Sequence, residues 1–376
     1  MSLTLVVDEN IPLAEAFFGH LGELRRVAGR DLRPEHVRDA DVLLVRSVTR
    51  VNEALLAGSA VRFVGTCTIG TDHLDTGYLE REGITWTNAP GCNANSVVEY
   101  VYAALAALDR DWQGATLGII GCGNVGGRLY QRMRAQGVDC RVYDPFLTRD
   151  QVPDLTDLEQ VLGADIICAH TPLTTDGPHP SHHLLNADNL PALKLGAVLL
   201  NAGRGPVIDN AALLALKRRR PDLHLVLDVW EPEPDLSVEL LDEAALGSPH
   251  IAGYSYDGKV RGTEMIYEAL CEHLGRAPQM TARTLVPPPE AAEIRVAGAD
   301  QWQALKQAIA AAYAIHEDDQ RLRASPETFD QQRKHYPVRR EFFNYRVTAE
   351  SGALPEALAE RLAALGFDTG IAGTED

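Results

Sequence analysis

The chain has 376 residues, which is too long for one ordinary domain and predicts two or three, each with its own hydrophobic core. Its content of 45% hydrophobic and 23% charged residues is typical of a soluble globular protein. The formal net charge of −18 argues against nucleic acid or an anionic membrane as a partner, because both would repel it.

The pattern of cysteines and apolar residues predicts a cytoplasmic protein. The six cysteines are scattered through apolar, strand-like runs without a C-x-x-C pair, so we expect buried thiols in a reducing compartment and no metal site. The sequence opens on a strand-like run rather than on a basic region followed by an apolar one. No apolar run approaches the roughly 20 residues needed to span a bilayer, so we expect no membrane partner.

The first hundred residues alternate short β-like runs with helical patterns, which predicts a parallel sheet covered on both faces. The expected strands are Leu3–Val7, Val42–Arg46, Val61–Gly65 and Ile84–Thr87, and the expected helices are Leu13–Leu21, Asn52–Ala57 and Asp75–Glu82. A long helix is expected at about Val97–Leu108. Ser96 and Glu99 have the spacing of a capping box at its start.

A second alternation of strands and helices supplies about six strands, as a doubly wound dinucleotide fold requires. The expected strands are Thr116–Ile120, Val138–Tyr143, Asp165–His170, Ala197–Asn201, Leu223–Asp228 and His250–Ile251. A helical stretch at about Gly262–Leu274 is long enough to return to the first domain. We therefore expect an α/β protein with a first domain of residues 1–95 completed by 256–284, and a dinucleotide domain of residues 96–255.

A third unit, residues 285–376, follows the proline cluster Pro287-Pro288-Pro289. Strands are expected at Glu293–Val296 and Phe342–Thr348, and helices at Gln301–Ile315 and Pro355–Leu365. This small α+β unit carries no recognisable catalytic motif. It would pair subunits or bind a regulator, and we favour pairing into a homodimer because paired faces commonly form two-fold dimers. Arg339 and Arg340 form either a solvated basic patch or part of an active site.

A glycine motif lies between an expected strand and an expected helix. Its residues are Gly121, Cys122, Gly123, Asn124, Val125 and Gly126. Glycines here let the strand turn tightly into the helix, whose N-terminus can then hold a pyrophosphate. Asp144 ends the next apolar run, where an acidic side chain accepts the ribose hydroxyls of NAD and disfavours the phosphate of NADP. Asp144 is also compatible with a plain turn before Pro145. We expect NAD as the cofactor.

Three polar residues follow later strands, where open α/β sheets place their sites. Arg204 could grip a carboxylate through two parallel hydrogen bonds, and His250 could take the proton of an alcohol as hydride leaves the same carbon. Glu233 could hold the imidazole, but Glu231 and Asp235 stand beside it, and spacing does not decide which carboxylate faces His250.

Each of these residues also has a structural interpretation. Taken alone, Arg204 could be a solvated arginine in a loop, and His250 could be a hydrogen-bonded histidine in the core. Asp228 ends an apolar strand, where it could cap a turn or contact the nicotinamide carboxamide. Their joint occurrence downstream of the glycine motif favours the catalytic interpretation.

In order, these segments resemble the D-2-hydroxyacid dehydrogenases over roughly residues 1 to 280. The matching segments are the glycine motif, His170-Thr171-Pro172, Asn201 to Gly205, Asp228 to Glu233 and Pro249 to Gly253. The resemblance implies a flavodoxin-like substrate domain and a Rossmann NAD domain. It also implies that Arg204 binds the substrate carboxylate, with His250 as acid/base and Glu233 as its partner. By the same resemblance, the cofactor is lined by His170, Thr171, Pro172, Ala202, Gly203, Arg204 and Gly253.

Further segments resemble the branch of this family that oxidises 4-phospho-D-erythronate on the route to pyridoxal phosphate. They include Val7 to Pro12, Leu44 to Thr49, Phe63 to His73, Ala89 to Ala94, His250 to Ser255 and Arg333 to Glu341. The resemblance implies homodimers paired by the C-terminal unit, and substrate contacts from Ser47, Thr68 and Tyr254 near Arg46. The alternatives are a dehydrogenase for another 2-hydroxy acid, such as 3-phosphoglycerate, and a non-catalytic protein that senses NAD.

Overall fold

The computed structural model describes residues 3–297 and 300–370. The chain forms two compact units. The first contains the residues up to Asn93 together with Ser255–Pro288, and the second contains Ala94–Tyr254 with the described residues from Pro289 onward. Within the described residues, no helix combines the length and the apolar character needed to cross a membrane.

The first unit is built on a parallel sheet in the order β2-β1-β3-β4-β5, the flavodoxin-like arrangement. Its strands are β1 (Leu3–Asp8), β2 (Gly22–Val27), β3 (Val42–Val45), β4 (Phe63–Thr66) and β5 (Thr85–Thr87). Its helices are α1 (Ala14–Phe18), α2 (Pro34–Val37), α3 (Glu53–Leu56), α4 (Thr76–Arg81), α10 (Tyr256–His273) and α11 (Ala282–Leu285), with a 3-10 turn at Gly29–Asp31.

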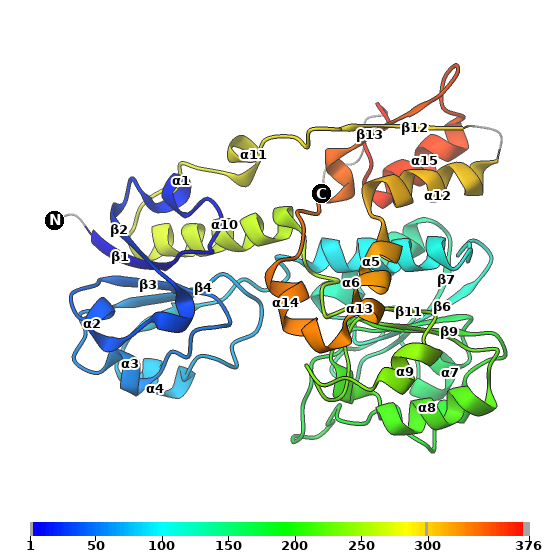
Figure 1. Ribbon diagram of the computed structural model, residues 1–376, viewed down its shortest axis with the longest axis horizontal. Coiled ribbons are helices and arrows are strands. Elements are labelled where there is room, and N and C mark those ends of the chain that lie inside the picture. Colours follow the sequence, from blue (N-terminus) through cyan, green and yellow to red (C-terminus); the bar gives the residue numbers. More distant parts are fainter. Residues whose placement is uncertain (1–2, 298–299, 371–376) are drawn as a thin grey trace. The chain divides into compact units, whose positions relative to one another are not determined.

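Both faces of this sheet are buried because alternate side chains of each strand point to opposite sides. Leu5 and Val7 of β1 pack into the same core as α1 and α10, whereas Val6 packs into the core formed with α2, α3 and α4. Figure 1 shows these two helical layers on the two faces of the sheet.

Two expectations for this unit need correction. Strand β2 was not predicted, because Glu23, Arg25 and Arg26 hide the apolar pattern of this edge strand. Helix α10 begins at Tyr256, before the expected Gly262, and the Ser255 side chain caps it by accepting from the amide of Gly258. Its glycines weakened the apolar pattern.

The second unit contains a six-stranded parallel sheet in the order β11-β10-β9-β8-β6-β7. Its strands are β6 (Thr116–Ile120), β7 (Asp139–Tyr143), β8 (Ile166–Ala169), β9 (Val198–Asn201), β10 (His224–Leu227) and β11 (Leu246–Gly247). Its helices are α5 (Ala94–Ala107), α6 (Asn124–Ala135), α7 (Leu158–Leu162), α8 (Asn210–Arg219) and α9 (Val238–Glu243), with 3-10 turns at Leu190–Ala192 and Gly205–Val207. This is the expected doubly wound dinucleotide fold.

The sixth strand and the start of α5 differ from expectation. The sixth strand is Leu246–Gly247, so His250 lies beyond it in a turn rather than in a strand. Helix α5 already begins at Ala94, which places Ser96 and Glu99 inside the helix and rules out a capping box. The Ser96 hydroxyl instead donates to the carboxylate of Glu341, 2.8 Å away.

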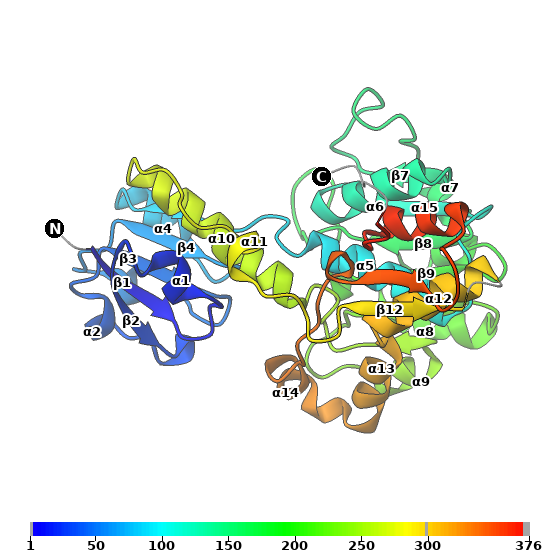
Figure 2. The same ribbon diagram turned by 90° about the horizontal axis from the view of Figure 1, so that it is seen from above.

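The residues from Pro289 onward add a small parallel pair of strands, with helices alongside (Figure 2). The elements are β12 (Glu293–Val296), β13 (Arg346–Ala349), α12 (Gln301–Ala312), α13 (Ile315–Ala324), α14 (Phe329–Lys334) and α15 (Glu356–Leu365), with 3-10 turns at Pro326–Thr328 and Phe342–Asn344. The single helix expected to Ile315 therefore ends at Ala312, and a second helix starts at Ile315. The strand expected from Phe342 begins at Arg346.

This C-terminal segment shares a hydrophobic core with the dinucleotide fold. Helix α12 packs against α5, and α15 packs against α6. A polar cluster joins the same parts: Glu99 accepts from the amide of Phe342 at 2.8 Å, and Arg339 donates to the carbonyl of Ala252 at 2.6 Å. Arg339 and Arg340 are both buried, so they do not form a solvated basic patch.

Candidate active site

The glycine motif forms the turn between β6 and α6. Gly121 has a φ of +84°, in the left-handed region that favours glycine. A side chain at Gly126 would lie 1.9 Å from the carbonyl oxygen of Gly121, so only glycine allows the helix to pack this closely. A Cβ at Gly123 would meet nothing within 4 Å, which leaves open space beside the start of α6 at Asn124 and Val125. That space suits a pyrophosphate at the positive end of the helix.

Asp144 lies beside this turn, directly after β7. Its Oδ2 accepts from the amide of Cys122 at 2.9 Å, and its Oδ1 accepts from the amide of Phe146 at 3.0 Å. The carboxylate therefore caps a local turn, as one sequence interpretation expected, and also contacts the glycine loop. Each carboxylate oxygen can still accept a further hydrogen bond from a ribose hydroxyl.

The carboxyl end of β8 adjoins the glycine loop at the point where the strand order reverses. A Cβ at Gly121 would lie 3.0 Å from the Cα of Thr171, and Pro172 follows in an exposed position. Both ring nitrogens of His170 are buried and have no hydrogen-bond partner among the described residues. Buried polar atoms without partners are uncommon in native proteins. Open space, a helix N-terminus, Asp144 and this imidazole together fit a bound dinucleotide.

Burial has a measurable consequence for His170, because it favours the neutral imidazole and lowers its pKa from 6.5 to about 4. Between these values the unfolded chain binds more protons than the folded chain. The free energy of unfolding should therefore fall as the pH is lowered from about 6.5 to about 4, with this residue contributing up to roughly 3 kcal/mol. Denaturant unfolding at about pH 7 and pH 5 measures this change.

The His170→Gln variant should lack this component of the pH dependence. The control is His179→Gln, which changes an exposed histidine further along the same loop and should keep the wild-type response. Identical pH dependence in wild type and His170→Gln would contradict the prediction.

Arg204 follows β9 in an exposed position. Asn201 shapes its loop by accepting from the amide of Gly203 at 3.1 Å and donating to the carbonyl of Arg204 at 3.0 Å. A Cβ at Gly205 would lie 1.7 Å from the carbonyl oxygen of Trp230, so this loop is pressed against the next one. The Arg204 guanidinium donates to the carbonyl of Gly203 at 2.8 Å and forms no ion pair within the described part of the chain. Its other donors remain for a carboxylate.

Asp228 is buried at the end of β10 and organises the turn that carries His250. It accepts from the hydroxyl of Ser248 at 2.6 Å and from the amides of Ile251 and Ala252 at 2.8 and 3.0 Å. Burial raises the pKa of its carboxyl, partly offset by the charge of His250. These contacts match the turn-capping role, and the predicted contact with the nicotinamide carboxamide stays a prediction.

His250 and Glu233 form a hydrogen-bonded pair, with His250 Nδ1 and Glu233 Oε2 2.8 Å apart. The other carboxylate oxygen accepts from the amide of Trp230 at 3.0 Å, which fixes its orientation. Burial alone would raise the pKa of Glu233, but the hydrogen bond and charge of His250 lower it. His250 has a φ of +56°, an uncommon conformation that is often found at functional sites. Its side chain is 28% exposed, so a substrate can reach it.

Glu231 faces a different histidine. His183 Nε2 lies 2.9 and 3.0 Å from its two carboxylate oxygens, and His182 stacks on the His183 ring at 4.0 Å. Two histidines and a carboxylate can in principle hold a metal ion, and these three offer ligand atoms within 4.8 Å of one another. The rings are only 23° from parallel, so their nitrogens do not converge on one point. The cluster instead joins the loop that follows β8 to the loop that follows β10.

Tyr254 lies against the C-terminal segment, where the sequence had offered only Arg339 and Arg340 as candidates for an active site. Its ring meets that of Tyr336 edge-on, with centroids 5.9 Å apart. The Arg333 guanidinium lies 5.8 Å from the centroid of the Tyr254 ring. Gly253 precedes Tyr254 in the same turn. The only sequence signal for these contacts was the motif-like stretch from Arg333 to Glu341.

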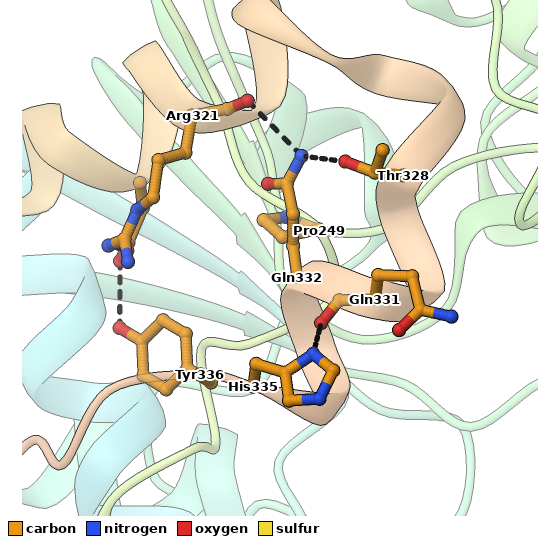
Figure 3. Close-up of a pocket in the computed structure, with 8 residues that line it drawn as sticks. Pro249, Arg321, Thr328, Gln331, Gln332, His335 and Tyr336 are labelled. Atoms are coloured by element: carbon orange, nitrogen blue, oxygen red, sulfur yellow. Dashed lines mark hydrogen bonds and ion pairs between the residues drawn. The ribbon is translucent and has the colours of Figure 1, made fainter.

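Figure 3 shows a pocket of about 380 Å³ next to the His250 turn. It is lined mainly by the C-terminal segment, including Arg321, His335 and Tyr336, and by Pro249. The Tyr336 hydroxyl donates to Asp318 at 2.8 Å, so that residue is held within the segment. None of the site residues predicted from the sequence lines this pocket, and we do not assign the reaction to it.

The remaining predicted substrate residues belong to the first unit. Arg46 and Ser47 follow β3, and Thr68 follows β4, so all three stand at carboxyl ends of the sheet. Arg46 pairs with the fully buried Asp8, with Nε and Oδ2 3.3 Å apart. The Thr68 hydroxyl lies 2.8 Å from that of Thr66, which fixes its orientation. Ser47 is exposed.

Comparisons with known proteins agree with this arrangement. The family "D-isomer specific 2-hydroxyacid dehydrogenase, NAD binding domain" matches residues 95–252, and a domain of unknown function, DUF3410, matches residues 285–366. D-lactate dehydrogenase of Aquifex aeolicus has the same fold, with a TM-score of 0.59 and 24% identity over 72% of this chain and 95% of its own. The 3-phosphoglycerate dehydrogenase of Entamoeba histolytica gives a TM-score of 0.61 and 23% identity over 73% and 96%. The protein is an NAD-dependent 2-hydroxyacid dehydrogenase.

Closer relatives narrow the class. The erythronate-4-phosphate dehydrogenase of Cellvibrio japonicus is 58% identical over 97% of this chain and 99% of its own length. The enzyme of the same name from Teredinibacter turnerae is 50% identical over 97% and 98%. The chain belongs to the erythronate-4-phosphate dehydrogenase family.

Proposed function

We propose that the protein oxidises 4-phospho-D-erythronate to 2-oxo-3-hydroxy-4-phosphobutanoate, a step toward pyridoxal phosphate. The observation that carries this proposal is the His250–Glu233 pair, held at 2.8 Å in the same unit as the glycine turn. The phosphorylated substrate comes from the names of the relatives.

Each polar group has a defined part in this reaction. Arg204 binds the substrate carboxylate through paired, charge-assisted hydrogen bonds. His250 takes the proton of the C2 hydroxyl on Nε2, and Glu233 holds the Nδ1 proton and stabilises the imidazolium that forms. NAD, when bound, accepts the hydride that leaves C2. Ser47, Thr68 and Tyr254 contact the rest of the substrate, near Arg46.

We assign the cofactor to residues of the second unit. Gly121, Gly123, Asn124, Val125 and Gly126 bind the pyrophosphate, and Asp144 binds the adenosine ribose. The nicotinamide half is lined by His170, Thr171, Pro172, Ala202, Gly203, Arg204 and Gly253. Asp228 acts beneath this surface by holding the turn of His250.

Substrate-dependent formation of NADH tests the proposal. The panel compares 4-phospho-D-erythronate with 3-phosphoglycerate and unphosphorylated erythronate, with several 2-oxo acids supplied as acceptors in case the cofactor stays bound. Turnover confined to 4-phospho-D-erythronate is the expected result. Turnover of another acid alone would support the proposed hydride-transfer chemistry but show that the proposed substrate is wrong. A protein that binds NAD but oxidises none of these acids would instead be an NAD sensor.

We also propose that the protein is a cytoplasmic homodimer paired through its C-terminal segment. Its six cysteines are free thiols, as a reducing compartment maintains them. Light scattering after size-exclusion chromatography should give about 82 kDa, twice the 41.0 kDa of one chain. A mass near that of one chain at micromolar concentration would contradict the dimer.

A further inference from the structure

Arg333 is a partly buried cation beside the proposed site. It comes from α14, within the domain of unknown function. Its guanidinium carbon lies 5.8 Å from the ring centroids of both Tyr254 and Phe329, so two aromatic faces hold it in place. The side chain is 29% exposed. It can therefore be reached from solvent while remaining anchored.

The hydrogen-bonding groups of Arg333 are incompletely used. Its Nε is buried and has no hydrogen-bond partner among the described residues. Its ion pair with Asp330 is long, at 3.6 Å, and Asp330 is 62% exposed. An exposed pair of this kind contributes little. The charge of the guanidinium is therefore weakly neutralised, and an anion that reaches its exposed nitrogens would be stabilised.

Several other arginines of the chain are bound to protein partners. Arg46 is paired with the buried Asp8 at 3.3 Å, which offsets its charge. Arg339 donates to backbone carbonyls, and Arg323 pairs with Asp319 at 2.9 Å. Within the described part of the second unit, Arg204 forms no ion pair, and Arg333 has only the long contact of 3.6 Å with Asp330.

Two available guanidiniums suit a substrate with two anionic ends. Arg204 is assigned to the carboxylate, whose α-carbon is the one that reacts. Tyr254 connects the His250 turn with Arg333, since it follows His250 in that turn and its ring lies beside the Arg333 guanidinium. Burial and His250 have the largest effects on the pKa of Glu233. The charge of Arg333 also lowers that pKa, by a smaller amount.

We propose that Arg333 binds the phosphate group of the substrate and so selects phosphorylated acids. The inference rests on the proposed function and assigns a role to the domain of unknown function. A guanidinium matches the geometry of a phosphate through parallel hydrogen bonds, and the aromatic faces keep its planar group oriented.

The test compares Arg333→Gln with wild type on phosphorylated and unphosphorylated erythronate. Loss of a charge-assisted contact should raise KM for 4-phospho-D-erythronate roughly 10- to 100-fold. The affinity of the NAD-loaded protein for unphosphorylated erythronate, which we do not expect to be turned over, should change less than about threefold. Arg333→Lys should recover part of the loss, because lysine restores the positive charge but not the two parallel hydrogen bonds of a guanidinium. Lys334→Gln, an exposed neighbour on the same helix, is the matched control and should behave as wild type.

Calorimetric binding of 4-phospho-D-erythronate to the NAD-loaded protein provides a readout that needs no turnover. Affinity should fall by the same factor in Arg333→Gln. Equal losses on both acids, or a shifted pH profile with unchanged KM, would overturn the inference, because Arg333 would then act through Glu233. A wild-type protein that binds the phosphorylated acid without oxidising it would refute the proposed function alone. Unchanged affinity in Arg333→Gln would refute the inference alone.

Discussion

Replacing His250 with alanine is expected to lower kcat by roughly 10²- to 10⁴-fold, the range usual for loss of a general acid–base group. The variant loses the acceptor for the C2 hydroxyl proton, whereas the glycine turn and Asp144 are untouched. NAD affinity should therefore stay within about threefold of wild type. Steady-state turnover of 4-phospho-D-erythronate and titration of NAD by protein fluorescence measure the two quantities.

A histidine near the site but outside the proton path provides the control. His335 lines the neighbouring pocket and contacts the carbonyl of Gln331, so His335→Ala should keep turnover close to wild type. If His250→Ala retained near-normal kcat, the assignment of the acid/base residue would be wrong. Glu233→Gln should have a smaller effect than His250→Ala, because it leaves the imidazole present but no longer paired with a charge.

Replacing Arg204 with alanine is expected to lower kcat/KM by about 10²- to 10⁴-fold. Two charge-assisted hydrogen bonds to the carboxylate are removed, each contributing roughly 1.5–3 kcal/mol. Both KM and kcat should suffer, since the same contacts hold C2 in position for transfer. Arg204→Lys should recover only part of the loss, because an ammonium cannot form the paired contact. The measurement is initial-rate kinetics over a range of acid concentrations.

Arg218→Ala is the control for removing one positive charge from this unit. Arg218 lies exposed on α8 and pairs with Glu239, away from the carboxyl ends of the strands. Its loss should leave both kinetic constants within about twofold of wild type. Unchanged KM and kcat in Arg204→Ala would exclude Arg204 as the carboxylate anchor.

The local parts of the site could be predicted from sequence. The glycine turn depends on the backbone conformation at Gly121 and on close packing at Gly126. Both requirements favour glycine, so both can be recognised from the residue type. The parallel sheets could be predicted for a similar reason, because buried strands leave continuous apolar runs. Strand β2 was missed because its side chains are charged and half exposed.

Spacing alone could not predict the partner of His250, because three acids lie within a few residues of one another, and only the family resemblance indicated Glu233. The choice of Glu233 depends on how the loop turns, with Trp230 donating to one carboxylate oxygen while His250 holds the other. Glu231 is turned toward His183 by the same loop. Spacing along the chain contains no information on this rotation.

Distant contacts explain the remaining failure. Ser96 and Glu99 have a capping-box spacing, yet their partners are Glu341 and the amide of Phe342, more than 240 residues further on. A local motif cannot reveal a partner of that kind. The role of Arg333 could not be predicted for the same reason. Its aromatic neighbour Tyr254 lies far away in the sequence, with helices α10 to α13 between them.

The hydrogen bond from Arg339 to the carbonyl of Ala252 has an evolutionary consequence. The bond ties the turn that carries His250 to a residue 87 positions further along the chain. Truncation of the chain before Pro289 would remove Arg339 from that carbonyl and the amide of Phe342 from the buried Glu99, and would expose the apolar surface of α5. The C-terminal segment therefore cannot be exchanged or lost as an independent module. Substitutions in it and in the His250 turn are expected to be inherited together.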